Sequence, residues 1–144
     1  MKEVIRIAVN KDSSRIIELL NSEKMLTSND NLIYNKGHIY EIINGSKSKT
    51  FVYVIDKKIV GLINFMVYKL GRYAEFYIII IDNKYRKKGI ARKLYDFAED
   101  KLRKSGINLI YGYTLENNNP MQIMLEKLNF DKGKKHYFYS KVLK

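Results

Sequence analysis

The sequence predicts an α/β protein of the α+β kind, in which helices cover both faces of one mixed sheet. Three runs of β-branched and aromatic residues, at 50–55, 59–68 and 73–82, indicate successive strands in the middle of the chain. Amphipathic segments with helical spacing lie before and after these runs, which favours helices packed on a sheet. The length of 144 residues suits a single domain covering 1–144.

The first part of the chain predicts one strand and two helices. Residues 3–9 form the strand, and Asp12, Ser13 or Ser14 can cap the helix that follows. A second helix is expected from about residue 32 to residue 43. The apolar face of the first helix contains Ile16, Ile17, Leu19 and Leu20.

Turn residues separate the three central strands. Asp56-Lys57-Lys58 predicts a hairpin turn between the first two, and Gly71-Arg72 marks the turn before the third. Residues 77–81 of the third strand are apolar on both faces. A strand without a polar face is buried on both sides, so we expect this one to lie centrally in the sheet.

The last part of the chain predicts two more helices and two more strands. An amphipathic helix begins near residue 90, and a strand is expected over 108–115. Asn119 can cap a short helix with Pro120 at its first position. A Tyr-rich strand over 136–143 ends the chain, which gives the order β-α-α-β-β-β-α-β-α-β.

Composition sets limits on the class of protein. The 27 Lys and Arg residues outnumber the 15 Asp and Glu residues, and the net charge of +12 favours a phosphorylated cofactor, RNA or an anionic membrane surface as partner. The charges are spread along the chain, however, so a solvated Lys-rich surface is the simpler interpretation. Cysteine is absent, which excludes a thiol nucleophile. Charged residues near the N-terminus stand where a signal peptide would be apolar, and the longest apolar run covers only residues 76–81. Both observations predict a cytoplasmic protein without a membrane span.

The segment most indicative of chemistry is a strand, a basic glycine loop and a helix. Arg86-Lys87-Lys88-Gly89-Ile90-Ala91 follows the third central strand, and Arg92 adds a further charge. A helix start offers free N–H groups and a positive dipole end, so this segment predicts a pyrophosphate site. The glycine motifs of nucleotide hydrolases and dinucleotide enzymes are absent. The alternative is a basic helix start with a glycine in a turn.

Arg86, Gly89 and Ala91 match all three fixed positions of the coenzyme A loop, [R/Q]-x-x-G-x-[G/A], of the GNAT superfamily of N-acetyltransferases. The opening strand with Asp12, the segment 59–61 and the segment 119–130 also resemble that superfamily. The resemblance implies a GNAT fold, with a mostly antiparallel sheet of six to seven strands and about four helices.

The resemblance also implies an activity. We expect direct transfer of an acetyl group from acetyl-CoA to a primary amine in a ternary complex, with a backbone N–H near Ile81 holding the acetyl oxygen. The acceptor would be an amine-bearing small molecule, a protein N-terminus or a lysine, no metal would take part, and a homodimer is expected. The residues expected to bind coenzyme A are Ile79, Ile80, Ile81, Arg86, Lys87, Lys88, Gly89, Ile90, Ala91, Arg92 and Asn119.

Glu75 is the candidate general base, because GNAT histone acetyltransferases place a glutamate at this position of the strand. The alternative is a solvent-exposed glutamate paired with Arg72 or a lysine. Leu125 stands where family members often carry the tyrosine that protonates the leaving thiolate, so the general acid is not identified. The tyrosines considered for that role are Tyr111, Tyr113, Tyr137 and Tyr139. Asn129 replaces a glycine of the family and can adopt left-handed backbone angles.

Two other functions stay open at the level of sequence. Basic charge and many tyrosines suit an RNA-associated binding module, or an enzyme that acetylates tRNA-borne amines, although a nucleic acid is the less favoured partner. The substitution at Leu125 suits a catalytically degenerate regulator that binds coenzyme A. Salt-dependent RNA affinity would distinguish the first of these, and cofactor binding without transfer would distinguish the second.

Overall fold

The computed structural model describes residues 1–23 and 35–143. Its contacts divide the chain into two compact units, Met1–Tyr113 and Thr114–Lys144, which are described separately. Among the described residues, no helix is both long enough and apolar enough to cross a bilayer.

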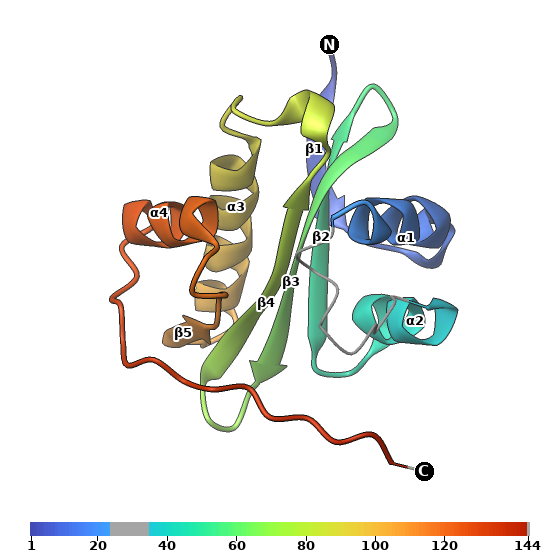
Figure 1. Ribbon diagram of the computed structural model, residues 1–144. Coiled ribbons are helices and arrows are strands. Elements are labelled where there is room, and N and C mark those ends of the chain that lie inside the picture. Colours follow the sequence, from blue (N-terminus) through green and yellow to red (C-terminus); the bar gives the residue numbers. More distant parts are fainter. Residues whose placement is uncertain (24–34, 144) are drawn as a thin grey trace. The chain divides into compact units, whose positions relative to one another are not determined.

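The first unit contains a five-stranded sheet in the order β1-β2-β3-β4-β5. Neighbouring strands are antiparallel except β5, which runs parallel to β4. Helices α1 and α2 cover one face of the sheet and α3 covers the other (Figure 1). The elements are β1 Glu3–Ile7, α1 Ser13–Asn21, α2 Lys36–Asn44, β2 Ser48–Ile55, β3 Lys58–Tyr68, β4 Tyr73–Ile81, α3 Ile90–Lys104 and β5 Leu109–Gly112.

The predicted order of elements in this unit is confirmed, with shifted boundaries. The first strand ends at Ile7 instead of residue 9, and the second helix begins at Lys36, while residues 32–34 of the prediction lie outside the described residues. The β2–β3 turn consists of Asp56 and Lys57, with φ of 46° and 71°, and Lys58 already belongs to β3. Two left-handed residues make the tight turn that matches the twist of paired strands.

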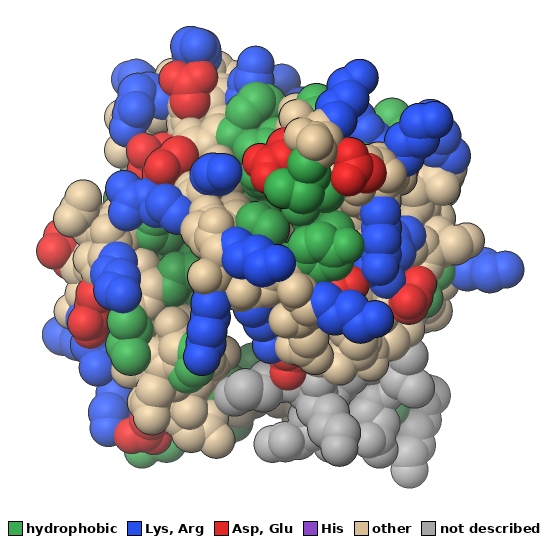
Figure 2. All heavy atoms as spheres, turned by 90° about the horizontal axis from the view of Figure 1, so that it is seen from above, with side chains coloured by type: hydrophobic (Ala, Val, Ile, Leu, Met, Phe, Trp, Pro, Cys, Tyr) green, Lys and Arg blue, Asp and Glu red, His purple; other side chains and the backbone are tan. Residues whose placement is uncertain are grey.

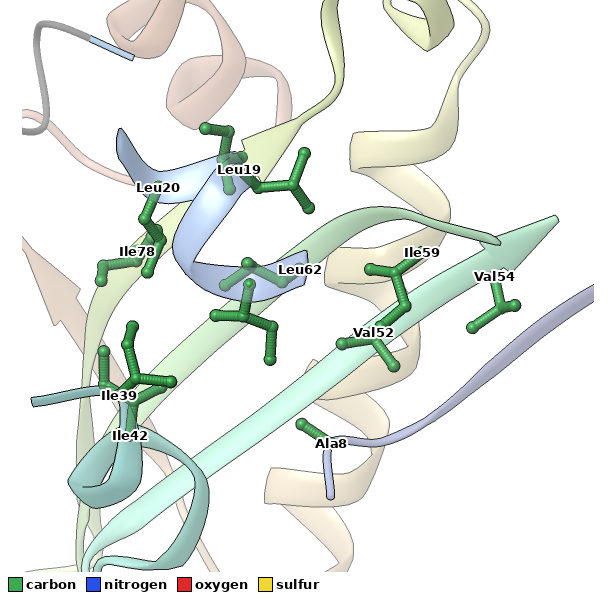
Figure 3. Packing of buried hydrophobic residues seen from close by; sticks show 12 residues of the cluster. Ala8, Leu19, Leu20, Ile39, Ile42, Val52, Val54, Ile59, Leu62 and Ile78 are labelled. Carbon is green, nitrogen blue, oxygen red and sulfur yellow. The ribbon is translucent and has the colours of Figure 1, made fainter. Parts of the chain in front are cut away.

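The main core lies between the sheet and helices α1 and α2 (Figure 3). Helical spacing places Ile16, Leu19 and Leu20 on one side of α1, and all three are buried. On the other face, Phe76 stacks on Tyr95 of α3 with 5.6 Å between ring centroids. The cluster under α1 and α2 contains Ala8, Ile16, Leu19, Leu20, Ile39, Ile42, Val52, Val54, Ile59, Leu62, Ile78 and Ile80.

A buried polar network fixes the end of α2 on the sheet. Asn64 of β3 is fully buried, and its Nδ2 donates to Ser48 Oγ at 2.7 Å and to Thr50 Oγ1 at 2.8 Å. Both hydroxyls in turn donate to the carbonyl of Ile42 at 2.6 Å. Because both buried hydroxyls donate to this one carbonyl, the network holds α2 in one position, and leaving a buried donor unpaired would cost about 1–3 kcal/mol.

Strand β4 contains one residue more than its partner. Phe76 pairs with Phe65 and Ile78 pairs with Asn64, so Tyr77 is the extra residue of a β-bulge. The bulge changes which residues face which helices: Phe76 contacts α3, whereas Ile78 belongs to the cluster under α1 and α2. The prediction that residues 77–81 are buried on both faces is therefore wrong at Tyr77, whose side chain is 43% exposed.

The second unit contains helix α4, Asn119–Lys127. The residue that caps it is Asn118, whose side chain accepts a hydrogen bond from the N–H of Met121 at 3.2 Å. The prediction of Asn119 as the cap is therefore wrong by one residue, because the side chain that bonds to the Met121 N–H is that of Asn118. After α4, Asn129 has φ of 66°, which confirms the expected left-handed backbone.

The sheet has fewer strands than the sequence predicts. No strand occurs over residues 136–143, and the described structure has five strands where six to seven are expected. The side chains of Tyr137, Phe138 and Tyr139 are exposed there. Alternating apolar residues make a strand only where another strand accepts and donates backbone hydrogen bonds. The strand expected over 108–115 is likewise reduced to β5.

Leu62 tests how much the core under α1 contributes to stability. It is fully buried, so Leu62→Ala should lower the free energy of unfolding by about 2–5 kcal/mol through lost burial and a residual cavity. Leu70→Ala is the matched control, because Leu70 is fully exposed in the β3–β4 turn and should change stability by less than about 0.5 kcal/mol. Urea denaturation measures both, and equal effects would contradict the assigned core.

Candidate active site

The loop between β4 and α3 is shaped by its backbone. Asp82 accepts a hydrogen bond from the N–H of Lys84 at 3.0 Å, which closes a short 3-10 turn over Asn83–Tyr85. The chain then passes through two left-handed residues, Lys87 with φ of 60° and Gly89 with φ of 77°. Glycine is the residue that adopts such angles without strain, so Gly89 is suited to the last step before α3.

The start of α3 is open to an anion. Gly89 is its N-cap residue and supplies no side-chain cap, and the first helical hydrogen bond runs from the N–H of Lys93 to the Gly89 carbonyl. The N–H groups of Ile90, Ala91 and Arg92 precede that bond and point out of the helix end. A Cβ added at Gly89 would meet no atom within 4 Å, so space is free beside these donors. This arrangement fits a phosphate group.

Basic side chains surround this opening. Lys87 and Lys88 are exposed, and the Lys88 ammonium lies 5.5 Å from the centre of the Tyr85 ring. Arg92 is also exposed and pairs with Asp96 one turn later at 3.1 Å, which offsets part of its charge. Figure 2 views this end of the first unit from above and shows many Lys and Arg side chains with a few acidic ones among them. Such a field attracts an anionic ligand.

Arg86 holds the loop in place. Its Nε donates to the carbonyl of Ile81 at 2.8 Å, and its guanidinium pairs with Glu23 at 2.9 Å. The side chain thus joins the end of β4 to the residues that follow α1. Its predicted role as a direct ligand of coenzyme A stays a prediction, while its positioning role is evident from these contacts.

Asp82 fixes the other side of the loop. Its carboxylate forms an ion pair with Arg15 of α1 at 2.5 Å and lies 4.0 Å from the ammonium of Lys58. Arg15 also donates to the carbonyl of Ile59 at 3.0 Å. The hydrogen bond from Lys84 and then the Arg15 guanidinium lower the pKa of Asp82, against the opposing effect of burial. Nothing in the sequence motif singled out this pair, because its members are 67 residues apart.

The end of β4 offers a backbone edge to a ligand. Strand β5 pairs only with Tyr73–Phe76, and no described strand of the first unit pairs with residues 77–81 on that side. The N–H of Asp82 donates to β3, and antiparallel bonds alternate along a strand. The N–H groups of Ile79 and Ile81 therefore point to the unpaired edge, whereas the backbone of Ile80 faces β3.

Glu75 lies two residues before the bulge and is partly buried. In the register of the sheet it pairs with Tyr111 of β5. Burial raises the pKa of Tyr77 and of Tyr111, and the nearby Glu75 carboxylate raises both further. Among the described residues Glu75 has no ion pair, so the expected alternative of a pair with Arg72 or a lysine is not found there.

The structure brings all but one of the predicted cofactor residues together. Residues 79–92 form one continuous stretch of the first unit, from the unpaired edge of β4 to the start of α3. Asn119 and Leu125 belong to the second unit, so their roles stay predictions. Sequence reasoning did not predict that Tyr77 is exposed, with its ring 6.4 Å from that of His38. Tyr77 is the extra residue of the bulge, and a bulge has no signal in an apolar run.

A separate hollow of about 920 Å³ lies among β1, the β2–β3 turn and the start of α1. Six Lys or Arg residues and two Asp residues line it, but Glu75 and the unpaired edge do not. Lys58 connects it to the loop, since its ammonium lies 5.7 Å from the centre of the Tyr85 ring. The hollow therefore adds positive potential beside the loop. In the described part of the chain no group of three His, Asp or Glu side chains could hold a metal ion.

Comparison with known proteins gives one family and many similar folds. A family model described as acetyltransferase (GNAT) family matches residues 13–130. An aminoglycoside acetyltransferase from an uncultured soil metagenomic sample superposes with a TM-score of 0.80 at 17% identity over 97% of each chain. A possible acetyltransferase from Clostridium difficile 630 gives 0.78 at 20% identity over 100% of each chain. The PaiA N-acetyltransferase from Thermoplasma acidophilum, solved with coenzyme A, gives 0.71 at 19% identity over 89% of each chain.

Asp82 gives a pH-dependent contribution to stability that can be measured. Because its pKa in the folded protein is below the ordinary 3.8, its stabilising effect is complete above that pH and is lost as pH falls through the folded pKa. Asp82→Asn keeps the bond to Lys84 but loses the charge opposite Arg15. We expect the variant to be less stable at pH 7 by roughly 1–2 kcal/mol, with the difference shrinking below about pH 4.

Thermal unfolding followed by circular dichroism between pH 7 and pH 2 would measure the difference. Asp100→Asn is the control, since Asp100 is exposed and pairs with Lys104 on the surface of α3. A constant difference between Asp82→Asn and the original protein at every pH would contradict the proposed ion pair.

Proposed function

The chain belongs to the acetyltransferase (GNAT) family, and on that premise we propose that it transfers an acetyl group from acetyl-CoA to a primary amine. One observation carries the proposal: an unpaired strand edge and an uncapped helix start lie on the same continuous segment, residues 79–92. An extended pantetheine chain needs the first, and a pyrophosphate needs the second.

The cosubstrate would lie along that segment. Its pyrophosphate would accept hydrogen bonds from the backbone N–H groups between Lys87 and Arg92 and gain from the dipole of α3. Its pantetheine arm would pair with the backbone of Ile81 at the edge of β4, as an added strand would. Arg86 would hold the loop against the end of β4, because its Nε donates to the carbonyl of Ile81. The pyrophosphate site and the pantetheine site would then keep a fixed position relative to each other.

The chemistry would be a direct attack of the amine on the thioester. Glu75 would take one proton from the acceptor ammonium, and the neutral nitrogen would form a bond to the acetyl carbon. The N–H of Ile79 on the free edge, which lies farther from the pyrophosphate loop than that of Ile81, would donate to the acetyl oxygen as negative charge develops there. The carbon–sulfur bond would break with its electron pair on sulfur. The second nitrogen proton would reach that thiolate directly or through water, and no side chain is assigned as the acid.

The wider assignment follows from the same premise. We infer one acetyltransferase domain over residues 1–144, supported by a family match that spans parts of both units. A cytoplasmic location and a homodimer remain part of this proposal. The acceptor is proposed to be an amine-bearing small molecule, a protein N-terminus or a lysine. The solved relatives include enzymes described as acting on aminoglycosides, which are amines.

Gly89 tests whether the loop binds the cosubstrate. Calorimetric titration of acetyl-CoA into the purified protein should show saturable binding to one site. Gly89→Glu should weaken it by at least about tenfold, because a carboxylate would stand where the phosphates bind. Gly133→Glu is the matched control, since it introduces the same charge at a glycine without a left-handed angle or close neighbours.

Binding that survives Gly89→Glu would contradict this placement of the cofactor. Saturable binding without transfer to any amine would favour a regulator that only binds coenzyme A. Absence of acetyl-CoA binding together with salt-sensitive RNA binding would favour the RNA-associated function instead.

Glu75 tests the acid–base step. With an accepted amine, Glu75→Gln should lower the turnover number by roughly 100-fold or more, while the affinity for acetyl-CoA stays unchanged. Thiol release from acetyl-CoA over a panel of amines measures turnover. Glu41→Gln on the exposed side of α2 is the matched control and should retain full turnover. Full turnover in Glu75→Gln would exclude this carboxylate as the base.

A further inference from the structure

We propose that the sheet face around Glu75 is a binding site for alkylammonium groups, in which tyrosine rings and the carboxylate together hold the cation of the acceptor. The inference rests on the proposed acetyl transfer and narrows its substrate class. The acceptor would be an aliphatic amine that arrives as its ammonium ion, and it would be recognised before its proton is removed.

The register of the sheet surrounds Glu75 with tyrosines. On β4, Tyr73 lies two residues before Glu75 in the regular part of the strand, so their side chains share a face. Tyr77 is the bulge residue, and its contact with His38 of α2 places its ring on one known face. Tyr111 pairs with Glu75 across to β5, and Tyr68 pairs with Tyr73 across to β3. The contact between Tyr77 and His38 of α2 shows that this face is the one that α1 and α2 cover.

The rings of this face form a connected row. Tyr68 stacks on Tyr73 with 5.0 Å between centroids, and Tyr73 lies 5.9 Å from Tyr111. Tyr113 continues the row 6.0 Å from Tyr111, in an edge-to-face arrangement. Tyr113 at the end of the row is 68% exposed, and Tyr77, on the other side of Glu75 along β4, is 43% exposed, so this aromatic surface is not the interior of the core. A solvent-accessible aromatic surface at this position is suited to a ligand.

The chemistry of the surface selects a cation. The face of an aromatic ring carries negative electrostatic potential and attracts an ammonium within about 6 Å. Glu75 adds a full negative charge and has no cationic partner among the described residues of the chain. An anionic ligand would be repelled there, and a neutral one would leave the carboxylate without a partner. An alkylammonium satisfies both the carboxylate and the rings.

The position also suits the reaction. Tyr77 comes two residues before Ile79, which is about 7 Å along a strand, and Ile79 begins the edge where the acetyl group is proposed to lie. A cation held between Glu75 and Tyr77 is thus close to the thioester. Burial and the neighbouring Glu75 carboxylate raise the pKa of Tyr77 and of Tyr111, so both hydroxyls stay protonated and the rings carry no charge to repel the carboxylate.

The test uses a cation that cannot be acetylated on nitrogen. Choline has no N–H to lose, and its neutral isostere 3,3-dimethyl-1-butanol, in which carbon replaces the nitrogen, has nearly the same shape without charge and dissolves in water. Each is titrated into the full-length protein bound to coenzyme A and followed by the NMR signals of the tyrosine rings. We expect the cation to bind at least about fivefold more tightly than the isostere, since the contact depends on charge.

Substitutions separate the ring face from the hydroxyl. Tyr77→Phe should keep the affinity within about twofold, whereas Tyr77→Leu should lower it by about fivefold or more, because leucine has no π face. Tyr113→Phe and Tyr113→Leu form a second pair at a more exposed position, which serves if Tyr77→Leu does not fold. Glu75→Gln should weaken binding of the cation and leave the affinity for the isostere unchanged.

Equal binding of the cation and the isostere, or equal losses in the Phe and Leu variants, would overturn the inference. Because the titration contains coenzyme A and no acetyl donor, binding of the probe is measured independently of acetyl transfer. Cation binding by a protein that transfers no acetyl group would therefore overturn the proposed function alone. Transfer to amines by a protein that does not discriminate the cation from the isostere would overturn this inference alone.

Discussion

The geometry of the candidate site depends on one extra residue in β4. In a regular strand Phe76 and Ile78 would lie on the same face of the sheet, because they are two residues apart. With Tyr77 as the extra residue, they pack on opposite faces. The pairing with β5 also stops at Phe76, directly before the bulge, and the backbone of 77–81 is left with one unused edge. The bulge thus exposes Tyr77 beside Glu75, and the backbone edge proposed to hold a thioester begins at the same place in the strand.

Much of the fold could be predicted because its signals are local. Helical spacing located α1 and α3, and the runs of β-branched residues located β2, β3 and β4. The missing strand over 136–143 shows the limit of this reasoning, since alternation describes which residues could face a core but not whether a partner strand is present. The bulge at Tyr77 shows a second limit. An apolar residue in an apolar run carries no mark of its pairing, which is decided by the neighbouring strand.

The candidate site was predictable where a short motif carries the chemistry. The free N–H groups at the uncapped start of α3 are a feature that the basic glycine loop led us to expect, whereas the positive φ of Gly89 was not predicted. The contacts that fix this loop were not predictable, because Asp82 binds Arg15 of α1 and Arg86 binds Glu23 just after α1. Both pairs join residues more than 60 positions apart. Such pairs are set by the packing of α1 against the sheet, which a single sequence does not reveal.

The continuous stretch 79–92 has a consequence for how this protein can change over time. The groups proposed to hold the donor are mostly backbone atoms of one segment, so most side-chain replacements elsewhere would leave them intact. The surface around Glu75 is instead assembled from side chains of β3, β4, β5 and α2. Single substitutions there could exchange one acceptor for another at little risk to the donor. Related proteins with this arrangement could therefore accept different amines and still catalyse the same reaction.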